Sequence, residues 1–115
     1  MNPEHLFAAL SDPTRLRSLM LIQSEGEVCV CELTHSLGES QPKISRHLAL
    51  LRDAGIVTAR RDGTWMHYSL NPELPSWARR SIDQIHRQLS GLDRFERDRA
   101  RLEDMSNRPG ELSCA

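Results

Sequence analysis

Two short amphipathic segments on either side of a glycine constrain the fold of this 115-residue chain most strongly. Apolar residues recur at helical spacing before and after Gly38, in two stripes: Val30, Leu33 and Leu37, and then Ile44, Leu48 and Leu51. A glycine between two such stripes indicates a tight turn. The stretch from Cys29 to Leu51 therefore predicts a helix, a turn and a second helix.

The second predicted helix has a polar and cationic outer face. Arg46 lies almost opposite the apolar stripe, and Lys43 and Ser45 flank it, so one face can pack inward while the other presents donors. A basic second helix in such a pair suits the major groove of DNA, where arginine can pair with guanine and glutamine with adenine. We predict groove contacts from five residues: Gln41, Lys43, Ser45, Arg46 and His47.

Residues 56–70 change to the two-residue period that is typical of strands. Apolar and polar residues alternate from Val57 onward, and Asp62-Gly63 is a strong signal for a hairpin turn. A hairpin that follows a helix-turn-helix is the wing of a winged-helix domain, and we predict that Arg60 and Arg61 contact the phosphate backbone. The fold class is mainly α with a small β-hairpin (α+β), a winged helix-turn-helix.

The flanking segments complete a small helical protein. We expect helices over residues 3–10 and 13–24, an extended segment over 27–29, and a dimerisation helix that carries Trp77, Ile82, Ile85, Leu89 and Leu92. Residues 1–92 form the predicted DNA-binding and dimerisation domain. Residues 93–115 are predicted to be a charged helical extension with a solvated surface, followed by a mobile tail from Asn107.

The distribution of charge matters more than its total. The chain has a net charge of −1, which is unusual for a protein that binds nucleic acid. Residues 1–39 carry a net charge of −4, whereas residues 40–70 carry +3. Positive charge is therefore concentrated in the segment that is predicted to meet phosphate.

The cysteine content indicates the compartment and the chemistry. An odd number of cysteines, two of them separated by one residue, argues against a disulfide framework and for reduced, reactive or ligating thiols. No apolar run is long enough for a membrane span, and the first residues lack the pattern of a signal peptide. We expect a cytoplasmic protein.

Several runs of the sequence together resemble one family. Glu-Val-Cys-Val-Cys-Glu-Leu at 27–33, Ser-Gln-Pro-Lys-Ile-Ser-Arg-His-Leu at 40–48 and Leu-Arg-Asp-Ala-Gly-Ile-Val at 51–57 are similar to the ArsR/SmtB family of bacterial metalloregulatory repressors, and most similar to its arsenic-responsive branch. Ser-Asp-Pro-Thr-Arg at 11–15 matches a family hallmark. The resemblance implies a homodimer, not an enzyme, that binds an inverted-repeat operator in double-stranded DNA. It also implies that the protein represses an arsenic-resistance operon and leaves the operator when arsenite or antimonite binds.

Residue by residue, the resemblance assigns Cys29 and Cys31 as the first two ligands of trivalent arsenic, a centre that favours soft thiolates. A third cysteine of that branch is replaced here by Thr34, so Cys114, a small thiol or no third ligand remain open. On a helix, residues i and i+2 point about 200° apart. We therefore expect ligation to bend or unwind the first turn of the helix that carries these cysteines and so to displace the DNA-reading helix.

Other functions compete with this hypothesis. The thiols could sense oxidation, although a disulfide within Cys-x-Cys is geometrically demanding. They could bind zinc or cadmium with His35, and the predicted last helix offers Asp83 and His86. The cysteines could also be buried packing residues of a structural or metal-carrying dimer. A thiol enzyme such as an arsenate reductase is a further alternative, but the chain has no phosphate-cradling loop.

Overall fold

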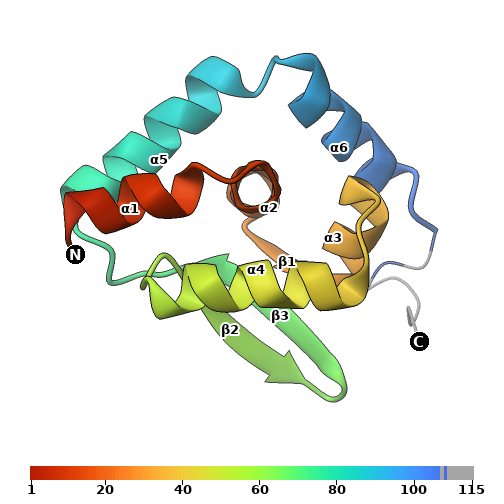
Figure 1. Ribbon diagram of the computed structural model, residues 1–115. Helices are drawn as coiled ribbons and strands as arrows, with labels where there is room; N and C mark the ends of the chain where they lie inside the picture. The colour runs from red at the N-terminus through yellow and green to blue at the C-terminus, as the bar shows by residue number, and fades with distance from the viewer. Residues whose placement is uncertain (107, 109–115) are drawn as a thin grey trace.

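The computed structural model describes residues 1–106 and 108, and Figure 1 shows the arrangement of its elements. Along the chain these elements are α1 (Pro3–Leu10), α2 (Pro13–Glu25), β1 (Glu27–Cys29), α3 (Val30–Leu37), α4 (Gln41–Asp53), β2 (Val57–Asp62), β3 (Trp65–Leu70), α5 (Ser76–Leu89) and α6 (Asp93–Glu103). The predicted winged helix-turn-helix is confirmed. No helix in the described part is long and apolar enough to cross a membrane.

Side-chain caps and prolines start three of the helices. Asn2, Asp12 and Ser40 each accept a hydrogen bond from a backbone N–H in the first turn that follows, and proline occupies one of the first two positions of each helix. Gly38 ends α3 in the left-handed conformation, with φ of 67°, and donates its N–H to the carbonyl of Thr34. These local signals fix the turn between α3 and α4.

The sheet has three antiparallel strands in the order β1-β3-β2. The hairpin turn is Gly63-Thr64, because Asp62 still pairs with Trp65, so the predicted Asp62-Gly63 turn was wrong by one residue. Gly63 has φ of 63°, which a two-residue hairpin loop of this kind requires. The short segment β1 adds to the free edge of β3 and forms the third strand.

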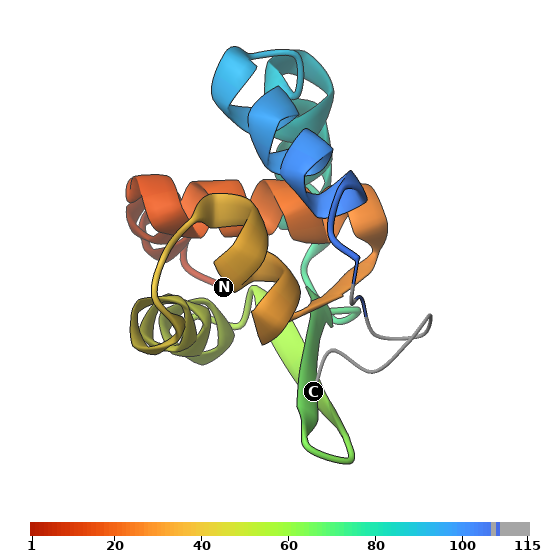
Figure 2. The ribbon, with the colours of Figure 1, turned by 90° about the vertical axis from the view of Figure 1, so that its right-hand side faces the viewer.

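Helix α2 runs through the centre of the molecule. In Figure 1 it is viewed along its axis, with α5 and α6 above it and with α4 and the sheet below. Figure 2 shows the β2–β3 hairpin projecting away from the helices. The core is formed by apolar side chains from all of these layers, including Leu21, Ile22, Val28, Leu33, Ile44, Leu48, Leu51 and Ile82.

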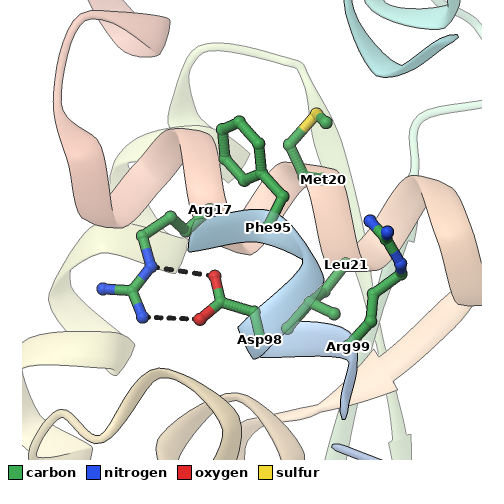
Figure 3. Close-up of a pocket in the computed structure, with 6 residues that line it drawn as sticks. All are labelled: Arg17, Met20, Leu21, Phe95, Asp98 and Arg99. Atoms are coloured by element: carbon green, nitrogen blue, oxygen red, sulfur yellow. Dashed lines mark hydrogen bonds and ion pairs between the residues drawn. The ribbon is translucent and has the colours of Figure 1, made fainter. Parts of the chain in front are cut away.

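Helix α6 corrects the prediction of a wholly solvated charge run. Its residues Phe95, Asp98 and Leu102 are buried, since α6 folds back and packs against α2 and α3. The positions i, i+3 and i+7 form one helical face, and the single acid on that face is neutralised. Asp98 accepts two hydrogen bonds from Arg17, at 2.8 Å from Nε and 2.6 Å from Nη2 (Figure 3).

The seam between α2 and α6 contains a crevice of about 150 Å³ lined by the six residues drawn in Figure 3. It is smaller than the ~300 Å³ of a typical small ligand site. Arg17 also donates to the carbonyl of Leu37 at the end of α3, at 3.3 Å. We therefore interpret this seam as packing that holds α6 and α3 against α2.

Breaking this ion pair should destabilise the fold. Asp98→Asn leaves Arg17, whose side chain is 22% exposed, without its charged partner, and we expect the free energy of unfolding to fall by about 2–3 kcal/mol. Urea denaturation at one fixed protein concentration measures the change. Asp83→Asn is the matched control, because Asp83 pairs with Arg87 on the surface of α5 and should cost at most about 0.5 kcal/mol. Equal effects of the two variants would contradict this role of Asp98.

Candidate nucleic-acid interface and thiol site

Four of the five residues predicted to face DNA on α4 lie on its outer side. Gln41 and Arg46 are exposed, and Lys43 and Ser45 are half-buried. Lys43 pairs with Glu39 one turn earlier, at 2.8 Å between Nζ and Oε2. The exposed ends of these side chains leave a polar, cationic face on the helix that follows the Gly38 turn.

The structure separates His47 from those four residues. Its side chain is only 9% exposed, and it points back toward the start of α2. Nδ1 lies 3.2 Å from Nη1 of Arg15, and since arginine can only donate, the imidazole accepts this hydrogen bond in its neutral form. His47 connects α4 to the rest of the domain, so the prediction that it faces the groove is wrong. The apolar i, i+4 pattern of Ile44, Leu48 and Leu51 did not include it, because a histidine reads as polar.

Arg15 joins three helices. Its Nε and Nη2 atoms donate to the carbonyl oxygens of Ala9 and Ala8 at the end of α1, and its Nη1 atom donates to His47 on α4. Its own backbone N–H donates to the capping carboxylate of Asp12. The Ser-Asp-Pro-Thr-Arg run therefore sets how α1, α2 and α4 meet, and this role was not apparent from the sequence.

The two wing arginines lie on opposite faces of the sheet, because they are consecutive residues of β2. Both are exposed. Arg60 shares a face with Glu27 of β1 and binds it through two hydrogen bonds, whereas Arg61 lies on the face that holds Val57 and Ala59. The hydrogen bond from Arg60 lowers the pKa of Glu27, so the pair is ionic at neutral pH.

Cys29 and Cys31 lie where the chain passes from a strand into a helix. Cys29 is the last residue of β1 and the N-cap of α3, with extended backbone angles, while Cys31 is in the first turn of α3. Their Cα atoms are 5.5 Å apart, and the two sulfur atoms are joined in a disulfide. The expectation that the thiols point apart was wrong, because only one of the two residues is helical. Unwinding of α3 is not needed to bring the sulfur atoms together.

Glu32 ties this junction to the C-terminal segment. Its carboxylate is 5% exposed as a residue and accepts hydrogen bonds from the Cys29 N–H at 2.8 Å and from Nε of Arg108 at 2.7 Å. Arg108 also bonds Glu25 at 2.8 Å. A buried acid beside two sulfurs thus has both a backbone donor and a cation as partners.

The other predicted metal ligands are not gathered around the sulfurs. His35 points to the carbonyl of Arg101 on α6, and Thr34 bonds the carbonyl of Val30. On α5, Asp83 pairs with Arg87 and His86 contacts Ser24. Within residues 1–106 and 108, no group of three or more His, Cys, Asp or Glu could hold a metal ion. Cys114 and the predicted mobile tail lie outside the described residues, apart from Arg108.

Comparison with known proteins agrees with this architecture. Residues 12–59, which span α2 to β2, match the family described as "Bacterial regulatory protein, arsR family". The arsenic resistance transcriptional regulator ArsR1 of Pseudomonas putida is 46% identical over 118 aligned positions, which cover all of this chain and 89% of that protein. The chain belongs to the ArsR family.

Two further relatives extend the match. The arsenical resistance operon repressor of Escherichia coli is 51% identical over 85 residues, which cover 74% of this ArsR-family chain and 73% of that protein. The solved structure of HlyU from Vibrio cholerae superposes with a TM-score of 0.66 at 30% identity, over 74% of this chain and 88% of that one. These relatives are transcriptional regulators by name or family, which excludes the predicted alternative of a thiol enzyme.

Four residues that shape the ArsR-family site were not predicted: Arg15, Glu27, Glu32 and Asp98. Each is a charged residue whose partner lies on another element, so no local pattern indicates it. Glu32 alone had a local signal, because an acid three residues after an N-cap is the signature of a capping box.

The stability of this ArsR-family domain should decrease in mild acid because of His47. Burial, and then the neighbouring cations Arg15, Arg46 and Lys43, lower the pKa of His47 from 6.5, against the opposing charge of Asp12. The unfolded chain therefore takes up a proton more readily than the folded chain as the pH falls below about 6.5, and unfolding becomes easier. Urea denaturation at pH 7.5 and 5.5 should show a smaller loss of stability for His47→Gln than for the wild type. An identical loss in both proteins would exclude this linkage.

Proposed function

We propose that this ArsR-family protein is a cytoplasmic transcriptional repressor of an arsenic-resistance operon. In this proposal it binds an inverted-repeat operator without any cofactor and leaves it when arsenite or antimonite binds Cys29 and Cys31. The observation that supports the effector most directly is the position of the two sulfur atoms, side by side at the junction of β1 and α3. The names of the relatives from Pseudomonas putida and Escherichia coli support the operon.

The proposed DNA contacts follow the outer face of α4 and the wing. Gln41, Lys43, Ser45 and Arg46 would face base edges or phosphates in the major groove, and Arg61 would meet the phosphate backbone at the wing. Arg60 can join them only if it leaves Glu27. His47 is not included, since it is buried against Arg15.

Arsenite binding would require the reduced pair of thiols. As(OH)₃ exchanges a hydroxyl group for each thiol: one S–As bond forms, and the thiol proton leaves with the hydroxyl as water. Two exchanges place arsenic between the sulfurs of Cys29 and Cys31, and the third position stays with hydroxide or a further donor. Soft thiolate ligands suit such a thiophilic centre.

The strand–helix junction offers a route from this chemistry to DNA. Cys29 is held in the sheet by the pairing of β1 with β3, whereas Cys31 belongs to α3. An atom inserted between the two sulfurs increases their separation and pushes α3 away from β1. Helix α3 packs against α4, so the DNA-reading face would change its position. A coupling of about 1–3 kcal/mol would weaken DNA binding roughly 5- to 150-fold.

The proposed operator symmetry requires a homodimer. Phe7 on α1, Trp77 on α5 and Leu92 after α5 are large apolar side chains that remain 59%, 38% and 48% exposed. Their burial against a second copy would account for the predicted dimerisation helix. A two-fold dimer presents two α4 helices to successive major grooves.

A second candidate effector is an oxidant, and the disulfide between Cys29 and Cys31 favours it. Hydrogen peroxide would oxidise the two thiols to this disulfide and be reduced to two waters. The sequence argued against a bond within Cys-x-Cys, but the extended conformation of Cys29 brings the sulfurs together. The same junction could therefore respond to oxidation.

Replacing the thiols should remove the response and leave DNA binding intact. We expect Cys29→Ser/Cys31→Ser to bind a duplex selected by the wild-type protein from a random library with an affinity within about two-fold of the wild type. Fluorescence anisotropy with arsenite should then show the 5- to 150-fold release only for the reduced wild type. A parallel titration with peroxide distinguishes the oxidant. Cys114→Ser is the companion variant, and we expect it to respond like the wild type. Release of the double serine variant by arsenite would refute the proposed site.

Arg46 should contribute to sequence recognition. Removing one bidentate contact to a base costs roughly 10- to 100-fold in affinity, so Arg46→Ala should bind the selected duplex at least ten-fold more weakly. Arg87→Ala is the control, because Arg87 lies on the surface of α5 beside Asp83 and should leave the affinity unchanged. Analytical ultracentrifugation and thiol titration should give wild-type results for both. Unchanged DNA affinity of Arg46→Ala would remove Arg46 from the interface.

A further inference from the structure

The ion pair between Glu27 and Arg60 links the sensor strand to the wing. Nη2 of Arg60 lies 2.6 Å from Oε1 of Glu27 and Nε lies 3.1 Å from Oε2, so both carboxylate oxygens are engaged. Such a bidentate pair is the strongest arrangement that arginine makes with a carboxylate. Arg60 is nevertheless on the surface, with 55% of its side chain exposed.

The pair spans the central strand of the sheet. Glu27 belongs to β1 and Arg60 to β2, and β3 runs between them. His67 of β3 is in register with Cys29 on one side and with Arg60 on the other, so these side chains share one face. The side chain of His67 is only 10% exposed, and its Nδ1 lies 4.0 Å from the Glu27 carboxylate. One face of the sheet thus carries a continuous series from a sensor thiol to a wing cation.

We propose that Glu27 is an intramolecular competitor of DNA phosphate for Arg60, and that the strand ending at Cys29 thereby controls the positive charge of the wing. This inference rests on the proposed function and deepens it. A guanidinium whose Nε and Nη2 are both bonded to a carboxylate cannot present the same edge to a phosphate. The DNA-bound state therefore has Arg60 on phosphate and Glu27 released, while the free state has the pair.

The sensor can act on this competition because Glu27 and Cys29 are the two ends of a three-residue strand. A displacement of Cys29 relative to β3 shifts the register or spacing of β1, and Glu27 moves with it. Metalloid binding that keeps Glu27 on Arg60 removes a phosphate contact from each wing. This effect adds to any change in α4 and uses a different part of the molecule.

A double-mutant cycle on DNA binding tests the proposal. The proteins are the wild type, Glu27→Gln, Arg60→Ala and the double variant, and the probe is the duplex selected by the wild-type protein, at several salt concentrations. We expect Glu27→Gln to bind two- to five-fold more tightly per wing, which matches the small strength of exposed ion pairs. The log–log salt slope should become steeper by about 0.9 for each phosphate gained. In the Arg60→Ala background, Glu27→Gln should change neither quantity.

The cycle separates competition from a simple change in net charge. Asp62→Asn removes the same charge nearer the wing tip and leaves the bidentate pair in place, so it should give a smaller increase in affinity and no change in slope. Equal gains from Glu27→Gln with and without Arg60 would overturn the proposal, as would a gain no larger than that of Asp62→Asn. If the wild type binds and releases DNA but Glu27→Gln is indistinguishable from it, only this inference fails. If the wild type binds no duplex at low salt, the proposed function fails and the inference fails with it.

Discussion

The pairing of β1 with the central strand β3 determines how this ArsR-family protein presents its thiols. Three residues, Glu27 to Cys29, add to the edge of the hairpin, and the chain enters α3 immediately afterwards. Cys29 is therefore extended and Cys31 helical, which brings together two sulfurs that a continuous helix would separate. Without this strand the cysteines could not form one chelating pair, and Glu27 would not reach the wing.

A second set of contacts supports the helix that carries the sensor. Helix α3 is held at its C-terminal end by Arg17, which also binds Asp98 of α6, and near its start by the bond between Glu32 and Arg108. The C-terminal part of the chain is thus a brace on α3 as well as a charged surface. Movement of α3 must work against these contacts, so the brace sets part of the free energy that an effector has to supply.

The helices, the turn at Gly38 and the wing could be predicted from sequence because their signals are local. Helical periodicity, proline at the first turn, capping side chains and a glycine hairpin act over a few residues. The errors arose where distant residues meet. His47 is buried by Arg15, and α6 is buried through Arg17, while the extended angles of Cys29 depend on a strand partner forty residues away. The family resemblance gave the two cysteines as a site, but not the geometry that makes them one.

The most direct test of the strand–helix coupling is amide hydrogen exchange of the reduced protein without DNA, with and without one equivalent of arsenite. Exchange reports local opening of individual segments. We expect arsenite to change protection at residues 27–37, and in the β2–β3 hairpin to which β1 is paired, while α5 stays unchanged. Unaltered exchange across 27–37 in protein that has bound arsenite would contradict the coupling.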